Sequence, residues 1–368
     1  MSTVTEQLRE SVLFERFRRP LAGIVALVVL VLLPLTGGSE TPFFVTILVE
    51  IFVFAIFAMG FNILTGYTGY VSFGHVLFLG SGAYGTVLLV SKAQMPFLVA
   101  GLLSLVGTAV LAFFVALVAF RRKGVYFAMI TLGAAQIIYT LFRTLNYVGG
   151  TTGLIIQPPT VFGYEFNPFS PMSYYYVYLA ILVLVYLLVR TLVRSPFGHA
   201  MQAIRENEER AEAIGYNVQR LKYASFTIAG VLSGFAGVLY AAYFSQVAPG
   251  STLYWTVTGN GLFMLLIGGL GTVIGPIIGA FFVIGSRYLL STYLGSLIPA
   301  EAPVYLQRLP ERWLLILGLV FIITVLQFPH GIASKLGFKR TREETDLAVR
   351  EDGPSGDKAL ADGGDCDE

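Results

Sequence analysis

The chain has 368 residues, of which 55% are hydrophobic and only 12% are charged, and its formal net charge is +2. A soluble domain is typically about 25% charged, so this much apolar surface excludes an ordinary soluble fold and favours a protein that sits in lipid. The single cysteine, Cys366, excludes a disulfide framework and a cysteine metal site. No continuous basic face is present, so we expect no nucleic-acid partner.

Ten apolar runs approach the roughly 20 residues that a helix needs to cross a bilayer. The sequence therefore predicts an all-α fold, a polytopic transmembrane helical bundle with about ten spans. The third and ninth runs are rich in glycine and could instead be broken or re-entrant helices. The predicted spans are residues 20–37, 43–64, 74–91, 97–120, 124–144, 174–193, 224–246, 256–274, 276–295 and 312–329.

Lysine and arginine mark one side of this bundle. They cluster before the first predicted span and after the fourth, sixth and tenth spans. Cytoplasmic connections carry an excess of these residues, and with ten spans all four clusters face the same side. We therefore predict that both termini are cytoplasmic, with an N-terminal segment at 1–19 and a membrane domain at 20–340. Residues 341–368 carry ten acidic and three basic residues and predict a disordered tail.

The connection of residues 194–223 is highly charged and has a helical pattern. Ser195 and Pro196 form a helix-start signal, and Gly215 is placed as the glycine that follows a helix end. We predict two short amphipathic helices in this cytoplasmic loop. A solvated loop without a partner is the alternative.

Glycine punctuates residues 65–86, within and around the third predicted span. Small residues let helices approach closely, whereas unwound glycine-rich turns expose backbone groups to a polar cavity. Both interpretations stay open, one a solute pathway and the other tight packing. The pathway candidates in this segment are Gly66, Gly69, Ser72, Gly74, His75 and Tyr84.

Two charged residues, Glu50 and Arg287, fall inside predicted spans. A charge at the bilayer centre costs at least about 2.5–3.5 kcal/mol, so each should face a cavity or a partner. The two side chains could therefore pair in the protein interior. Alternatively, Glu50 lies near the outer interface and Arg287 extends to the membrane surface.

Catalytic and metal-binding motifs are absent from the sequence. His75 and His199 have no carboxylate or cysteine neighbours at metal-ligand spacing, so we predict no metal site. No phosphate-binding G-x-x-x-x-G-K-[ST] loop is present. We therefore expect neither an enzyme nor a cofactor in this chain, and any ATP hydrolysis must occur on another one.

Several fragments resemble a known transporter family. Residues 209–215, Glu-Arg-Ala-x-x-x-Gly, resemble the E-A-A-x-x-x-G loop of importer-type ABC permeases. Together with the ordered fragments at 131–136, 149–154 and 203–208, they resemble the permease family of branched-chain amino acid ABC importers, specifically its LivM-type subunit. The resemblance runs from about residue 43 to 330.

This resemblance implies a multi-pass permease of the cell membrane that works by alternating access. Its implied partners are a homologous second permease, two cytoplasmic ATPase subunits that hold the ATP and Mg²⁺, and an extracytoplasmic solute-binding protein. The coupling contact with the ATPases would involve Gly198, Arg205, Glu209, Arg210, Ala211 and Gly215. Transport of urea or short amides, and a stand-alone channel or secondary carrier, remain as alternatives.

Overall fold

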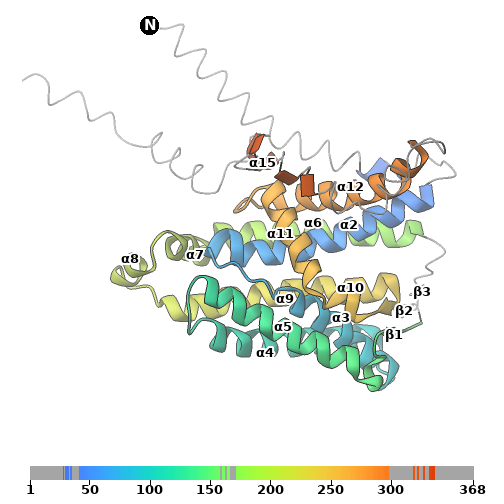
Figure 1. The fold of residues 1–368 in the computed structure, drawn as a ribbon, viewed down its shortest axis with the longest axis horizontal. Helices are drawn as coiled ribbons and strands as arrows, with labels where there is room; N and C mark the ends of the chain where they lie inside the picture. Colours follow the sequence, from blue (N-terminus) through green and yellow to red (C-terminus); the bar gives the residue numbers. More distant parts are fainter. Residues whose placement is uncertain are drawn as a thin grey trace, which may run out of the picture.

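The computed structural model describes residues 41–157, 160–161, 164–165, 171–297 and 331–335, with isolated positions between 28 and 34 and between 318 and 327. This part is mostly helical, and its long helices run side by side along one direction (Figure 1). Five helical segments within it are long and apolar enough to cross a membrane, namely Phe43–Thr68, Phe97–Ala119, Val125–Thr144, Tyr174–Arg194 and Val218–Phe244. The prediction of a helical, multi-pass membrane protein is confirmed at this level.

The elements follow one another with few long connections. In chain order the helices are α2 (Thr41–Asn62), the π-helix η2 (Ile63–Thr68), α3 (Val76–Ser91), α4 (Phe97–Ala119), α5 (Val125–Thr144), the 3₁₀-helix η3 (Asn146–Val148), α6 (Pro171–Arg194), α7 (Pro196–Glu206), α8 (Glu208–Ala213), α9 (Val218–Phe244), α10 (Pro249–Thr252), α11 (Trp255–Gly268), α12 (Gly275–Leu297) and α15 (Ile332–Lys335).

Two of the predicted spans form helices that are too short to cross a membrane on their own. The run 256–274 contains only the 14-residue α11, which ends at Gly268, and α3 has 16 residues. At about 1.5 Å per residue neither helix alone covers a hydrocarbon core of about 30 Å. The ninth run, in contrast, forms the continuous 23-residue helix α12. Glycine content therefore identified the short helix α3, but it did not identify the short helix α11.

Parts of the predicted organisation lie outside the described residues. These are the N-terminal segment 1–19, the tail 341–368, and most of the runs 20–37 and 312–329. The predicted loop 194–223 is shorter than expected, because α9 begins at Val218. The side chain of Asn217 accepts a hydrogen bond from the backbone of Arg220 at 3.1 Å, which caps the start of α9.

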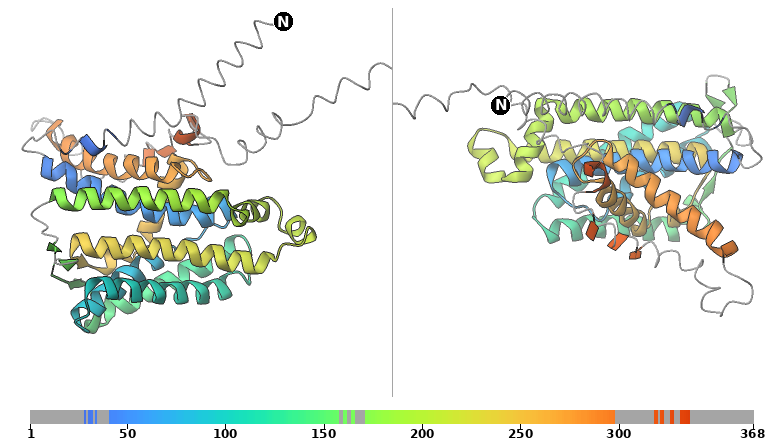
Figure 2. Two further views of the ribbon diagram at one scale, coloured as in Figure 1. Left: turned by 180° about the vertical axis from the view of Figure 1, so that it is seen from behind. Right: turned by 90° about the horizontal axis from the view of Figure 1, so that it is seen from above.

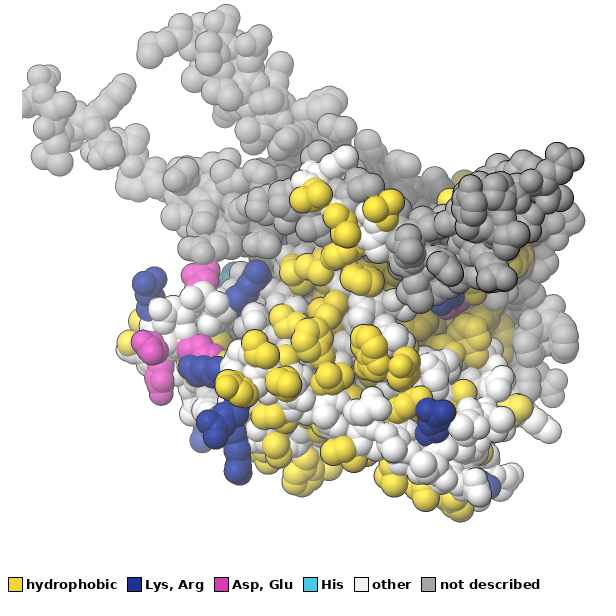
Figure 3. Space-filling model, viewed as in Figure 1, with side chains coloured by type: hydrophobic (Ala, Val, Ile, Leu, Met, Phe, Trp, Pro, Cys, Tyr) yellow, Lys and Arg dark blue, Asp and Glu magenta, His cyan; other side chains and the backbone are white. Residues whose placement is uncertain are grey.

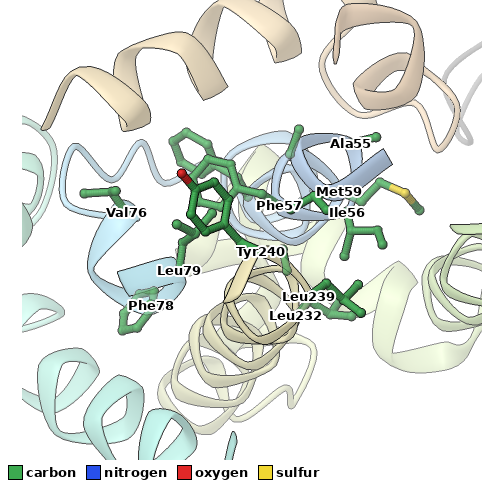
Figure 4. Packing of buried hydrophobic residues seen from close by; sticks show 14 of the residues in the cluster. Ala55, Ile56, Phe57, Met59, Val76, Phe78, Leu79, Leu232, Leu239 and Tyr240 are labelled. Carbon is green, nitrogen blue, oxygen red and sulfur yellow. The ribbon is translucent and has the colours of Figure 1, made fainter. Parts of the chain in front are cut away.

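The centre of the bundle is α9, which packs against α2, α3 and α4. Large side chains from α2, α3 and α9 converge in a buried cluster that includes Phe57, Phe78 and Tyr240 (Figure 4). Glycine permits the closest approach: a Cβ on Gly82 of α3 would collide with the carbonyl of Gly234 on α9. This close helix contact is typical of membrane bundles, where small residues take the place of a hydrophobic driving force.

The outward faces of α4 and α5 carry large exposed apolar side chains, among them Leu102 (65% exposed), Phe114 (61%) and Ile137 (69%). Charged side chains gather mostly at the end of the molecule where α7 and α8 lie, whereas the visible lateral face is largely uncharged (Figure 3). A soluble monomer rarely exposes so broad an apolar face. This surface is suited to lipid.

The two ends of the bundle differ in structure. At one end α7 and α8 project beyond the long helices, and short strands lie at the other (Figure 2). Strand β1 (Leu154–Ile155) pairs antiparallel with β4 (Gln246–Val247), and β2 (Thr160–Val161) pairs with β3 (Tyr164–Glu165). The fold is therefore not strictly all-α, because the loop after α5 contains one small strand pair, β2–β3, and a second strand, β1, that pairs with the segment after α9.

Candidate functional site

The projecting helices α7 and α8, called here the tip helices, are set by their capping residues. The Ser195 hydroxyl accepts a hydrogen bond from the Gly198 backbone at 3.4 Å, and Pro196 occupies the first helical turn. Asn207 then caps α8 by accepting from the Arg210 backbone at 2.9 Å. These are the residue types that helix starts favour, so the prediction of two short helices in this loop is confirmed.

The α8 helix presents an exposed surface beyond the bundle. Ala211 is buried against Ile204 and Val218, whereas Glu209 and Arg210 point to solvent. Gly215 follows the helix with a φ of +95°, a left-handed conformation that glycine adopts without strain. The turn exposes two apolar side chains, Ile214 (68% exposed) and Tyr216 (40% exposed).

A direct hydrogen bond joins the tip helices to the end of the α2–η2 span. Arg205 of α7 donates to the backbone carbonyl of Gly66 in η2. Gly66 lies within the last turn of its helix, where carbonyls have no partner inside the helix. Gly69 closes η2 with a φ of +83°, and a Cβ on it would meet the Arg205 side chain at 2.9 Å. The absence of a side chain at Gly69 thus leaves room for Arg205 to reach the backbone of the span.

Glu208, the first residue of α8, is the centre of a second set of contacts, called here the Glu208 cluster. Its carboxylate pairs with Lys123, in the turn between α4 and α5, at 2.6 Å and with Lys222 of α9 at 2.7 Å. It also accepts a hydrogen bond from the Tyr70 hydroxyl. One carboxylate therefore bonds the tip helices to three separate parts of the membrane bundle.

Electrostatics favour the ionised form of Glu208. Burial alone would raise the pKa of this carboxyl, but the hydrogen bonds from Lys123, Lys222 and Tyr70 outweigh burial and lower the pKa to about 2. The same carboxylate raises the pKa of Lys123. The Lys222 ammonium also lies 5.1 Å from the centre of the Tyr70 ring, a favourable cation–π distance. The Glu208 carboxylate is therefore ionised at neutral pH.

The end of α2 also contacts the turn between α11 and α12. The Asn62 side chain donates to the Thr272 carbonyl at 2.8 Å and accepts from the Gly271 backbone at 3.1 Å. A recess of about 810 Å³ opens beside this junction, between residues 68–73, the α4–α5 turn and the tip helices. Four segments that are distant in sequence therefore meet at one end of the bundle.

The glycine-rich segment after η2 is packed tightly against its neighbours. A Cβ on Gly74 would collide with the Thr131 carbonyl of α5. His75 is fully buried, stacks on Phe61 with 4.5 Å between ring centres, and its Nε2 lies 2.7 Å from the Ser233 hydroxyl. These contacts favour the packing interpretation for this part of the segment.

Two buried hydroxyl groups nearby have a different character. The Ser72 and Tyr84 oxygens have no hydrogen-bond partner among the described residues, although the Tyr84 ring packs edge-on against Phe142. Buried hydroxyls normally have partners. These two positions therefore remain candidates for contact with a solute or with water.

Glu50 and Arg287 form an ion pair between α2 and α12. The Arg287 Nη2 atom lies 2.5 Å from Glu50 Oε1, and the Tyr288 hydroxyl donates to Glu50 Oε2 at 2.7 Å. Of the two arrangements considered from the sequence, the structure has the pair. This pair contacts neither Arg205 nor Glu208, so the candidate residues fall into separate groups.

Comparison with known proteins assigns the family. A family model described as "Branched-chain amino acid transport system / permease component" matches residues 43–325. The chain belongs to this permease family.

Individual relatives agree with that assignment. The chain is 28% identical over 307 residues to the high-affinity branched-chain amino acid transport system permease protein LivM of Escherichia coli, which covers 76% of this chain and 67% of that protein. It is 26% identical over 237 residues to the probable LivM permease of Methanocaldococcus jannaschii, and the match covers 63% of this chain and 66% of that protein. The probable LivH permease of the same archaeon is 28% identical to it over 159 residues, and this match covers 43% of this chain and 46% of that protein. The resemblance to LivM-type permeases is confirmed.

Membership of this family makes the chain a transport permease and not an enzyme. It is a multi-pass protein of the cell membrane, in agreement with its apolar helices. Within this permease, the sequence patterns did not identify Glu208, Lys123, Lys222 or Asn62 as parts of one junction. The available signal was Lys222, a charged residue at the start of an apolar helix that the structure leaves only 4% exposed.

Proposed function

We propose that this permease moves a branched-chain amino acid across the cell membrane by alternating access, driven by two separate ATPase subunits. The family and the names of its LivM relatives support the choice of solute. The ATPases would hold the ATP and Mg²⁺, and this chain would need no cofactor. A homologous second permease would complete the pathway, as the similarity to both LivM and LivH proteins suggests, and an extracytoplasmic binding protein would deliver the solute.

The observation that carries this proposal is the construction of the tip helices. They project beyond the bundle (Figure 1) and expose Ile214, Tyr216, Glu209 and Arg210. An apolar edge with charged flanks is suited to a groove on another protein. A compact helix that docks there can transmit motion from the partner to the pathway only if it is attached firmly to the membrane helices.

Two groups of contacts make that attachment, and a third contact extends it across the bundle. Arg205 holds η2, the Glu208 cluster holds α9 and the α4–α5 turn, and Asn62 extends the connection to the turn before α12. A displacement of the tip helices would therefore act on several spans together. An ATPase subunit contributes no residues to the pathway. It could reorient the pathway through such an arrangement, because the tip helices are connected to several membrane helices.

Reconstitution of the complete complex in liposomes tests the proposal. With ATP inside the liposomes and binding protein outside, we expect uptake of labelled leucine that stops when ATP or the ATPases are omitted. Uptake by the two permeases alone would contradict the proposal and indicate a channel or secondary carrier. Uptake of labelled urea or acetamide in place of leucine would keep the ATP-driven mechanism and change the solute.

A further inference from the structure

The ion pair of Glu50 and Arg287 lies well inside the membrane part of the bundle. Glu50 is nine residues beyond the first residue of α2, and Arg287 is twelve residues beyond the first residue of α12. At about 1.5 Å per residue these positions are roughly 13 and 18 Å along their helices. Charges at such depth are costly and commonly mark a solute or ion pathway.

The two charges differ in how far they are enclosed. The Glu50 side chain is 7% exposed and both of its oxygens are bonded, whereas the Arg287 side chain is 32% exposed. Only the Nη2 atom of Arg287 bonds Glu50, and a guanidinium group carries five N–H donors in a planar fork. Arg287 is therefore the accessible, positively charged residue of the pair, and Glu50 is enclosed behind it.

We propose that this pair is a binding site for the zwitterionic α-amino group and α-carboxylate of an amino acid, an inference that rests on the transport function proposed above. The carboxylate of the solute bonds Arg287, and the solute ammonium then takes the place of Arg287 at Glu50. One ion pair is exchanged for two, and the net charge of the site stays at zero. A neutral zwitterion thus passes without leaving an unpaired charge in the bundle.

Apolar groups next to the pair suit an aliphatic solute side chain. The Phe43 ring packs edge-on against Tyr288 with 6.0 Å between ring centres, and Phe43 is 39% exposed. The Arg287 guanidinium lies 4.8 Å from the centre of the Tyr288 ring, which keeps the cation oriented while its partner changes. Urea and short amides lack both charges and cannot make this exchange, so the site selects amino acids.

The first test is uptake of labelled leucine by the full reconstituted complex with the double variant Glu50→Gln and Arg287→Met. Replacing a buried ion pair by neutral groups of similar volume is often neutral for stability, so a purely structural pair would leave uptake near the wild-type rate. The site proposed here predicts a fall of about tenfold or more, with ATP hydrolysis and thermal stability retained. Unchanged leucine uptake would overturn the inference. A wild-type complex that hydrolyses ATP but takes up no leucine would instead overturn the proposed function.

A second test does not depend on the variant pair folding. In a Cys366→Ser background, Phe43→Cys places a thiol next to Tyr288 of the intact site. Tyr147→Cys, in η3 after α5, is an exposed control that reports reagent access. Leucine should slow modification of the thiol at position 43 and not the one at 147. Leucinamide and N-acetylleucine each retain a single charge and should protect little. Equal protection by all three compounds, or by none, would contradict a zwitterion site.

Discussion

Arg205 of α7 donates a hydrogen bond to the carbonyl of Gly66, which lies 139 positions earlier in the chain. The acceptor is one of the last carbonyls of the π-helix that ends the α2 span, so the bond satisfies a group that the helix leaves open. π-helical turns occur often at functional sites. This single contact joins the projecting tip helices to a transmembrane element.

Replacing Arg205 should weaken the transfer of motion from the ATPases. For Arg205→Gln we expect leucine uptake by the reconstituted complex to fall about tenfold while ATP hydrolysis continues, because coupling contacts commonly contribute about 0.5–2 kcal/mol. The measurement is the number of leucine molecules taken up per ATP hydrolysed. Arg122→Gln is the matched control, since Arg122 is an exposed arginine of the α4–α5 turn. Equal ratios in the two variants would argue against a role of Arg205 in coupling.

The Glu208 cluster should stabilise the permease itself. In Glu208→Gln the Lys222 ammonium, which is only 4% exposed, loses its carboxylate partner. We expect a loss of about 1–3 kcal/mol, less than for a fully buried pair because Glu208 is partly exposed. Thermal unfolding of the permease pair without ATPases measures this loss. Glu209→Gln, one residue along on the exposed side of α8, should change stability by less than about 0.5 kcal/mol.

The stability contributed by Glu208 should depend on pH only in acid. Its folded-state pKa of about 2 is below its ordinary value of 4.5, so the ionised carboxylate contributes fully above pH 4.5 and its contribution is lost as the pH falls toward 2. The raised pKa of Lys123 keeps that ammonium charged to higher pH than usual. The difference in unfolding temperature between wild type and Glu208→Gln should stay constant from pH 6 to 8 and shrink below 4.5. A difference that already shrinks near pH 6 would show that Glu208 is not held ionised.

Glycine contacts between α3 and α9 should be sensitive to a single methyl group. For Gly82→Ala we expect a loss of about 1–3 kcal/mol, because the new Cβ collides with the Gly234 carbonyl. Gly107→Ala on α4 has nothing within 4 Å of its Cβ and should be neutral or stabilising by up to about 1 kcal/mol. Thermal unfolding compares the two variants. Similar losses in both would mean that close packing is not what the glycine at 82 provides.

Local signals in the sequence predicted much of the helical framework. Hydropathy placed α2, α4, α5 and α6 within a few residues of their observed bounds. Capping chemistry predicted α7 and α8, because Ser195, Pro196 and Gly215 act on backbone groups only a few residues away. The end of α11 at Gly268 was not predictable in this way, since the apolar run continues and the turn is held by the distant Asn62.

The sequence predicted some residues of the candidate site, but it did not predict which of them contact one another. Glu50 and Arg287 were identifiable as charges in apolar runs, but their pairing joins positions that are 237 residues apart. The Glu208 cluster joins residues from α4–α5, α8 and α9, and no local pattern encodes such a meeting. Packing of the whole bundle determines these contacts, so only the structure shows them.

The central claim is that an ATPase subunit binds the tip helices. Cross-linking of the tip helices to the ATPase tests this claim most directly. With Glu212→Cys on the exposed side of α8 and Cys366→Ser to remove the native thiol, a short thiol-to-amine cross-linker should join this permease to an ATPase subunit in the assembled complex. The yield should change when ATP is added. No cross-link to the ATPase, or labelling of this cysteine in intact cells by a reagent that cannot cross the membrane, would contradict the account.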